Sequence, residues 1–266
     1  MSLIETHATD DIKLTDAPPV LARIRVVLCR TSHPGNIGAV ARAMMNMGLH
    51  ELVLVDPAVP NFARSTETIQ RASGATGVLN DARVVATLEE ALADCVLAIA
   101  CTARARDLTH QTGTVRHACG EALGLVASDP QHRIALVFGN ERSGLSNEEV
   151  LLCNRTAHIP ANPNFSSLNL AAAVQVFAYE CRVAAGETAV PASKSDSFPL
   201  ATHEGLEGFY AHLESTLVAI GYIDPHNPRR LMPRFRRLFG RARVEKEEID
   251  LLRGILTRVT HPRRDG

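Results

Sequence analysis

The chain has 266 residues, of which 45% are hydrophobic and 21% are charged, and its formal net charge is -1. This composition is that of an ordinary globular protein, and the balanced charge excludes a general electrostatic attraction to nucleic acid or to anionic lipid. No apolar run approaches the roughly 20 residues that a membrane span needs. We therefore expect a cytoplasmic protein without a membrane partner, whose length suits one large domain or a large and a small one.

The N-terminal residues mix acidic and polar side chains without the apolar stretch of a signal peptide, and we expect residues 1–22 to form a disordered leader. The six cysteines occur singly, without a CxxC pair or a histidine at metal-ligand spacing. They are Cys29, Cys95, Cys101, Cys119, Cys153 and Cys181. Most of them lie in apolar runs, so we expect buried free thiols in a reducing compartment and no metal site.

From residue 24 onward, short β-rich runs alternate with segments that carry helical signals. The predicted strands are Ile24–Cys29, Glu51–Val55, Cys95–Cys101, Ile134–Phe138 and Thr156–Ile159. Two of the intervening helices begin with capping-box pairs, Thr87 with Glu90 and Ser146 with Glu149. Apolar strands that alternate with helices predict an α/β fold with a mostly parallel sheet covered on both faces, over residues 23–185.

The segment from Ser32 to Arg42 joins the first predicted strand to a helix and resembles a dinucleotide-binding loop. Gly35 and Gly38 lack the Gly-x-Gly spacing that such a loop requires, which argues against an NAD-dependent oxidoreductase. If Asn36 caps the helix, an apolar stripe faces the core and Arg42 points away from it. That stripe consists of Ile37, Val40, Ala41, Met44 and Met47.

Two further segments, Phe138–Leu145 and Ile159–Leu170, also place glycine or small polar residues where a strand gives way to a helix. The first of them mimics a P-loop, but Leu145 occupies the place of the obligatory lysine. Taken singly, these residues can be explained as local caps, with Ser166 or Ser167 as an N-cap and Asn164 in an Asx-turn. Three such segments together predict one composite site, because glycine and helix N-termini expose backbone donors to a ligand.

A linker is predicted over residues 186–202, followed by a small all-helical domain over residues 203–266. Its expected helices are Gly205–Ile220, Arg229–Phe239 and Glu245–Val259. An arginine run without lysine suits bidentate phosphate contacts and predicts RNA binding by Arg229, Arg230, Arg234, Arg236, Arg237, Arg241 and Arg243. The alternatives are a solvated face paired with nearby carboxylates, and an RNA surface around Arg23, Arg25 and residues 104–106 instead.

The three segments, in this order and spacing, resemble the SPOUT class of S-adenosylmethionine-dependent RNA methyltransferases. The matching motifs are N-x5-R at Asn36–Arg42, GxExxGL at Gly139–Leu145 and S-x-N-L at Ser167–Leu170. With its helical tail, the chain is most similar to the TrmJ type of tRNA 2'-O-methyltransferases, which modify the ribose of nucleotide 32 in the anticodon loop. The leader has no counterpart in this resemblance, and Cys101 stands where a small or hydroxyl residue is expected.

This resemblance implies a C-terminal trefoil knot in the α/β domain and a homodimer with its active site at the subunit interface, beside Met44, Met45 and Met47. It also implies S-adenosylmethionine as the cofactor and tRNA as the partner. The implied cofactor-binding residues are Cys101, Thr102, Ala103, Gly139, Glu141, Gly144, Ile159, Ser166, Ser167 and Leu168.

The implied catalytic residues are Arg42, Asn36, Ser167 and Asn169. A guanidinium stays protonated at ordinary pH, so Arg42 is expected to bind a phosphate and to stabilise an alkoxide rather than to act as a base. Two alternatives stay open. One is an RNA-binding protein of the same fold that is catalytically inactive, and the other is a 2'-O-methyltransferase that acts on another tRNA or rRNA position.

Overall fold

The computed structural model describes residues 17–59, 61–103, 112–187, 199–226 and 230–261. Most of the expected disordered leader, residues 1–16, lies outside this description. The rest of it corrects the expected boundary, because Pro19–Arg23 forms a short 3-10 helix, η2, whose Leu21 is fully buried in the core. The α/β unit therefore includes residues that precede 23.

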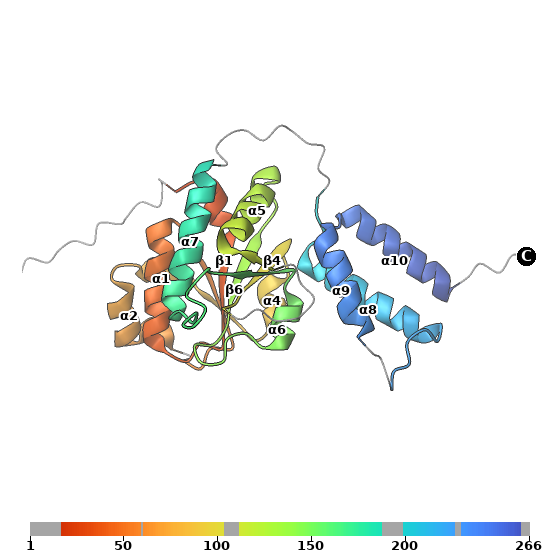
Figure 1. Ribbon diagram of the computed structural model, residues 1–266, viewed down its shortest axis with the longest axis horizontal. Helices are drawn as coiled ribbons and strands as arrows, with labels where there is room; N and C mark the ends of the chain where they lie inside the picture. Colours follow the sequence, from red (N-terminus) through yellow and green to blue (C-terminus); the bar gives the residue numbers. More distant parts are fainter. Residues whose placement is uncertain (1–16, 60, 104–111, 188–198, 227–229, 262–266) are drawn as a thin grey trace, which may run out of the picture.

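A parallel sheet forms the centre of the α/β unit (Figure 1). Over the described ranges it has seven strands in the order β3-β2-β1-β6-β4-β7-β5, and all neighbours pair in parallel. The strands are β1 Ile24–Cys29, β2 Glu51–Val55, β3 Arg83–Val85, β4 Leu97–Cys101, β5 Thr112–Thr114, β6 Ile134–Phe138 and β7 Arg155–His158. The predicted parallel α/β architecture is confirmed.

All five predicted strands are present, and their bounds agree with the sequence exactly or within two residues. The bounds of β1, β2 and β6 are as predicted, β4 begins later, at Leu97, and β7 is shifted to Arg155–His158. The strands β3 and β5 were not predicted. Both have mostly exposed or half-buried side chains, so they lack the apolar run on which strand prediction depends.

Helices cover both faces of the sheet, and alternate residues of each strand pack against opposite layers. Leu28 shares a core with helices on one face, and Val27 shares a second core with helices on the other. The first layer contains α1 Pro34–Met47, η3 Phe62–Arg64, α2 Thr66–Ala72, α3 Thr76–Asn80, α5 Val115–Ser128 and α7 Leu170–Glu187. The second contains α4 Leu88–Leu92 and α6 Asn147–Leu152.

The two predicted capping boxes differ in the structure. At α6 both hydrogen bonds between Ser146 and Glu149 are present, as predicted. At α4 the Thr87 hydroxyl accepts from the backbone N–H of Glu90, but the Glu90 carboxylate accepts from Ala86 rather than from the cap residue. Thr87 is thus a single N-cap, not half of a box.

Gly38 allows α1 and α2 to approach each other closely. A Cβ atom added to Gly38 would lie 2.1 Å from the backbone oxygen of Thr68 in α2. We expect Gly38→Ala to destabilise the protein by about 1–3 kcal/mol, since two helix backbones would have to separate. Gly124→Ala in α5 is the matched control, because open space surrounds that position and alanine there favours the helix. Urea unfolding tests this, and equal midpoints for the two variants would contradict it.

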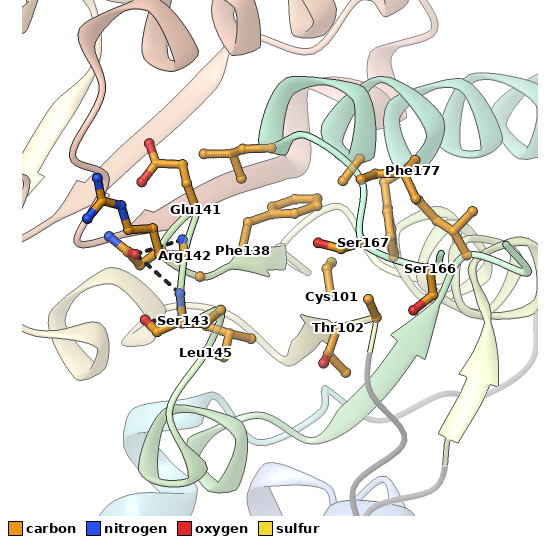
Figure 2. Close-up of a pocket in the computed structure, with 18 residues that line it drawn as sticks. Cys101, Thr102, Phe138, Glu141, Arg142, Ser143, Leu145, Ser166, Ser167 and Phe177 are labelled. Atoms are coloured by element: carbon orange, nitrogen blue, oxygen red, sulfur yellow. Dashed lines mark hydrogen bonds between the residues drawn. The ribbon is translucent and has the colours of Figure 1, made fainter. Parts of the chain in front are cut away.

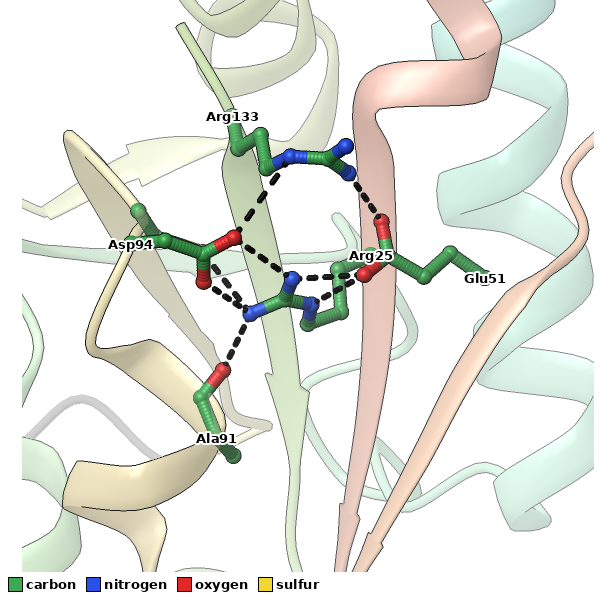
Figure 3. Close-up of polar contacts among 6 residues, drawn as sticks. Arg25, Glu51, Ala91, Asp94 and Arg133 are labelled. Carbon is green, nitrogen blue, oxygen red and sulfur yellow. Dashed lines mark hydrogen bonds and ion pairs between the residues drawn. The ribbon is translucent and has the colours of Figure 1, made fainter. Parts of the chain in front are cut away.

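Arg25 lies at the amino ends of β1 and β4 in a buried polar cluster (Figure 3). Its guanidinium is 2% exposed and donates to Glu51 at 2.7 Å, to Asp94 at 2.6 Å and to the Ala91 oxygen at 2.6 Å. Burial alone would lower the pKa of Arg25, but Asp94 and Glu51 raise it above the ordinary value, so the group stays charged. Arg25 therefore fixes the sheet to the end of α4 and is not an RNA-binding residue.

The cysteines are free and buried as expected, except that Cys101 is half-buried. Among the described residues, no group of His, Cys, Asp or Glu side chains could hold a metal ion. Nor does any helix in the described ranges have an apolar stretch sufficient to span a bilayer.

The tail forms the predicted three-helix unit, with α8 His203–Ala219, α9 Leu231–Ala242 and α10 Lys246–Thr260. Its core contains Phe209 and Phe239, whose rings are 4.8 Å apart in an edge-to-face contact. Of the predicted linker, residues 188–198 lie outside the description. The flanking parts belong to the domains, because α7 continues to Glu187 and Ala201 is buried in the tail core.

The tail contacts the α/β unit next to α4 and α6 (Figure 1). The first two N–H groups of α8 donate to backbone oxygens at the end of α4, from His203 to Cys95 at 2.7 Å and from Glu204 to Ala93 at 3.1 Å. Arg155 of β7 donates to the Gly240 oxygen at 2.6 Å. Backbone hydrogen bonds and a buried arginine therefore join the two units.

Candidate functional site

A pocket of about 170 Å³ opens at the carboxyl ends of β4, β6 and β7, which are adjacent in the sheet (Figure 2). Ligands of parallel α/β sheets usually bind at this edge. All ten residues predicted to bind a cofactor line it: Cys101, Thr102, Ala103, Gly139, Glu141, Gly144, Ile159, Ser166, Ser167 and Leu168. The structure thus brings residues 101–103, 138–145 and 159–168 to one cavity.

The pocket wall is apolar and has few charges. Phe138 and Phe177 form one side, with ring centroids 5.4 Å apart at an angle of 87°. Burial raises the pKa of Cys101 well above its ordinary value, so this thiol stays neutral. The sequence analysis missed Phe138, Phe177, Leu170 and Ala173 as lining residues. The position of Phe138 at the end of a predicted strand was the available signal.

The Gly139–Gly144 loop leaves no room for a side chain at its start. A Cβ atom on Gly139 would lie 2.1 Å from the backbone of Gly144, which has a φ of 68°. Asn140 holds the loop closed, since its side-chain oxygen accepts from the N–H groups of Arg142 and Ser143 and its amide donates to the Arg30 oxygen. Asn140 was also missed, although asparagine beside glycine is a turn signal.

Every residue of this loop lines the cavity. Together with the aromatic and aliphatic wall, these residues suit a ligand that has a flat ring and a few polar edges. The chemistry of the pocket therefore fits an uncharged heterocycle such as adenine.

The Glu141 carboxylate connects the pocket to the start of α1. It accepts hydrogen bonds from the Ser32 N–H at 3.1 Å, the Ser32 hydroxyl at 3.0 Å, the His33 N–H at 3.2 Å and the Asn36 amide at 3.1 Å. Burial alone would raise the pKa of Glu141, but the hydrogen bonds from Asn36 and the backbone lower it. The carboxylate therefore remains ionised while it holds the first motif against the second.

The structure corrects three expected caps. The helix α1 begins at Pro34 with His33 in the N-cap position, so Asn36 is not a cap. At α7, the Asn169 side-chain oxygen accepts from the Ala171 N–H at 3.0 Å, in place of Ser166 or Ser167. The Asx-turn is formed by Asn162, which accepts from Asn164. At α7 and in the Asx-turn, the expected residue lies within three residues of the asparagine that actually accepts the hydrogen bond.

Asn36 and Asn169 complete a chain of hydrogen bonds through all three segments. The Asn169 amide donates to the Asn36 side-chain oxygen at 3.1 Å, while Asn36 donates to Glu141. Both asparagines also line a second, open cavity of about 370 Å³ with Glu67 and Arg71 of α2. No sequence signal pointed to Glu67 and Arg71, because α2 lies outside the three motifs.

Arg42 is exposed, as predicted, but it lines neither cavity. Six residues of α-helix turn through about 600°, so Arg42 projects roughly 120° away from Asn36. The structure therefore brings Asn36 and Asn169 into contact and places Ser167 in the pocket, but leaves Arg42 on a separate face of α1. The backbone of α2 lies directly against Gly38, one turn before Arg42.

The Glu141 hydrogen bonds give a pH-dependent prediction. Because the folded pKa is lowered, their contribution to stability is present above the ordinary pKa of glutamate and is lost as the pH falls through the folded value. Glu141→Gln should lower the free energy of unfolding by about 1–2 kcal/mol at pH 7, and by less as the pH falls below about 4. Thermal unfolding at several pH values tests this, with Asp81→Asn, an exposed carboxylate, as the control. A difference that is constant down to pH 3 would contradict it.

The predicted RNA-binding arginines fall into two groups. Arg230, Arg234, Arg237 and Arg241 are exposed, and Arg229 lies outside the described residues. Arg236 and Arg243 already pair with carboxylates, and their binding to RNA stays a prediction. Arg236 donates to both oxygens of Glu207 and stacks over Tyr210 at 4.6 Å, and Arg243 donates to Glu121 at 3.0 Å.

Comparison with known proteins follows the same division of the chain. The model of the SpoU rRNA Methylase family matches residues 23–179, and the model of the C-terminal domain of the tRNA methyltransferase TrmJ matches residues 204–266. The chain is 48% identical over 246 residues to the tRNA (cytidine/uridine/adenosine-2'-O-)-methyltransferase TrmJ of Pseudomonas aeruginosa, covering 90% of this chain and 94% of that protein.

A tRNA (cytidine/uridine-2'-O-)-methyltransferase TrmJ of Klebsiella pneumoniae is 47% identical over 243 residues, covering 90% of this chain and 97% of that protein. Among solved structures, TrmJ from Z. mobilis ZM4 is similar with a TM-score of 0.74 and 35% identity, covering 88% of this chain and 97% of that one. The similarity extends through the α/β unit and the tail alike.

Proposed function

The chain belongs to the SpoU rRNA Methylase family and carries a TrmJ-type C-terminal domain, and from this premise we propose that it methylates the ribose 2'-hydroxyl of tRNA. The observation that carries the proposal is the hydrogen-bonded chain Glu141–Asn36–Asn169, which joins the pocket to α1. This hydrogen-bonded chain links Glu141, which lines the pocket, to Asn36 and Asn169, which line the second cavity.

The cofactor S-adenosylmethionine supplies an electrophilic methyl group when it is bound. The residues of the pocket fit it, since Gly139, Ile159 and Leu168 line it and offer an apolar surface to an adenine ring. Thr102 and Ala103 close the pocket on the side of β4. These groups would hold the ligand through shape and backbone hydrogen bonds, because almost no charged side chain lines the cavity.

The catalytic task of the protein is to place the ribose hydroxyl in line with the methyl group and to assist the loss of its proton. Both polar atoms of the Asn36 side chain already bond to Glu141 and Asn169, so we assign it a positioning role. Ser167 lines the pocket and is the residue that we assign to orient the hydroxyl. Arg42 would bind the adjacent phosphate and stabilise the developing alkoxide.

The position of Arg42 supports a homodimer with its active site at the subunit interface. Since Arg42 lies outside both cavities of its own chain, we propose that it serves the pocket of a second copy. The methionine cluster does not support this, because Met44 is fully buried and Met45 and Met47 pack against the core of their own chain.

Mixing two inactive variants tests the shared site. Arg42→Ala and Ser167→Ala should each be inactive alone, and exchange of their subunits should recover activity, because one hybrid site would hold both residues. A monomer mass at micromolar concentration with full activity, or no recovery after verified exchange, would contradict the proposal.

We further propose that the C-terminal part of the α/β unit forms a trefoil knot and that the protein is cytoplasmic. Family membership supports the knot, together with the strand order, in which β7 lies next to β4 rather than beside β6, the strand that precedes it.

We propose nucleotide 32 of the anticodon loop as the target, with cytidine or uridine as the base. Nucleoside analysis of tRNA from cells that lack this protein tests the proposal. It should show loss of a 2'-O-methyl group at that nucleotide, restored by the wild-type gene and not by Arg42→Ala. If tRNA methylation were unchanged, the protein would instead be an inactive RNA-binding member of the family or would act on another RNA position.

A further inference from the structure

Phe165 has the most exposed large hydrophobic side chain among the described residues, at 82%. It lies in the loop between β7 and α7, immediately before Ser166 and Ser167, both of which line the pocket. Burying such a side chain is favourable, and this chain leaves that free energy unused. An aromatic ring held in water at the mouth of a pocket is available to a partner that arrives with the substrate.

The loop holds the ring in a defined place. The Phe165 N–H donates to the Asn162 backbone oxygen at 2.9 Å, and the Asn164 N–H donates to the Asn162 side chain at 3.0 Å. Pro160 and Pro163 restrict the backbone further. Phe165 is thus presented by an ordered turn, so a partner that binds it has little loop entropy to remove.

The surroundings of Phe165 favour an RNA base over a protein surface. Protein interfaces have contiguous apolar patches, whereas the exposed neighbours of Phe165 include Asn162, Asn164 and Ser167. Unpaired RNA bases stack on single aromatic rings and offer polar edges to nearby amides and hydroxyls. A lone ring among asparagines and serine matches that chemistry.

We propose that Phe165 stacks on an unpaired base of the loop that contains the target ribose; this inference rests on the proposed function. Ser167 is two residues away and contacts the pocket, so a base on Phe165 places its own ribose, or that of the next nucleotide, at the pocket mouth. Phe165 is a positioning residue that selects an unpaired loop over a paired stem, because bases within a helix cannot offer a free face.

Tryptophan fluorescence tests the contact directly, because the natural chain contains no tryptophan. In Phe165→Trp the new indole should be quenched when an anticodon stem-loop is added, and a fully paired RNA duplex should quench it far less. Val84→Trp is the control, since Val84 is 54% exposed on β3, at the far edge of the sheet. Equal quenching of the two variants, or none at residue 165 at saturating RNA, would overturn the proposal.

Substitutions of Phe165 separate stacking from simple apolar contact. Phe165→Ala and Phe165→Leu should both weaken tRNA binding by about 5- to 150-fold, while Phe165→Tyr retains it, since stacking requires an aromatic face. Binding of S-adenosylmethionine should change little in all three. If leucine binds tRNA as well as phenylalanine does, the stacking proposal is wrong.

Two outcomes distinguish the alternatives. If Phe165→Ala converts a dimer into a monomer, the ring is covered by a second copy and the RNA proposal fails. If the wild-type protein methylates tRNA but Phe165→Trp is not quenched, only this inference fails, whereas a wild-type protein that leaves tRNA unmethylated contradicts the proposed function itself.

Discussion

Replacing Arg42 by alanine is expected to lower the rate of methyl transfer by about 100- to 1000-fold, the usual cost of removing a group that stabilises developing negative charge. Binding of S-adenosylmethionine should stay within a few-fold of wild type, because Arg42 is exposed on α1 and lines neither cavity. Arg42→Ala should therefore lose methyl transfer while it keeps cofactor binding.

Single-turnover kinetics and calorimetry on the same preparation measure both quantities. Arg42→Lys should recover only part of the rate, because an ammonium lacks the planar fork that binds phosphate with two hydrogen bonds. Arg83→Ala removes an exposed arginine from β3, at the edge of the sheet away from the pocket. It should change neither the methyl-transfer rate nor cofactor binding. Parallel loss of cofactor binding in Arg42→Ala would show that Arg42 holds the pocket rather than the substrate.

The second large effect is expected from the exposed tail arginines. A variant with Arg234, Arg237 and Arg241 all changed to glutamine should bind tRNA more weakly. Its plot of log affinity against log salt should be shallower by about 2–3, since each lost phosphate contact removes roughly 0.7–0.9 from the slope. Filter binding at several salt concentrations measures both quantities.

Arg243→Gln is the matched control for the slope. Its guanidinium already donates to Glu121, so its loss should leave the salt dependence unchanged. Unchanged affinity and slope in the triple variant would show that tRNA binds to another surface of the protein. Arg25 is excluded as an alternative because it is buried, and residues 104–106 lie outside the described residues.

Point substitutions are preferable to removal of residues 205–266, which the sequence alone would suggest. Removing the tail would expose Arg155. Its guanidinium donates to Gly240, and its side chain is 9% exposed in the intact chain. It would also leave the end of α4 without part of its contact with α8. Weaker RNA binding by the truncated protein would then report damage to the α/β unit as well as the loss of arginines.

The sheet and the pocket follow from local sequence to a large extent. The buried strand β6 is a continuous apolar run, β1 is apolar except for Arg25, and pocket residues lie where β6 ends. A ligand pocket at the carboxyl edge of a parallel sheet needs only the strand ends and the glycines, which are visible in the sequence.

Partners that are distant along the chain could not be predicted in the same way. Glu141 bonds to Asn36, 105 residues earlier, so a local interpretation assigned Asn36 to a helix cap. The arginine run of the tail looked uniform, yet Glu207 and Glu121, from other helices, bind Arg236 and Arg243. Local pattern gives the residue types of a site, and tertiary packing decides which of them are already occupied.

The most direct test of the central claim is the location of the methyl group. Purified protein would be incubated with an unmodified tRNA transcript and S-adenosylmethionine that carries a deuterated methyl group, and nuclease fragments of the tRNA would be analysed by mass spectrometry. We predict one deuterated methyl group on the ribose of nucleotide 32, which also makes the following phosphodiester resistant to alkali. A label on a base, or an unlabelled tRNA after incubation with protein that binds S-adenosylmethionine, would contradict the account.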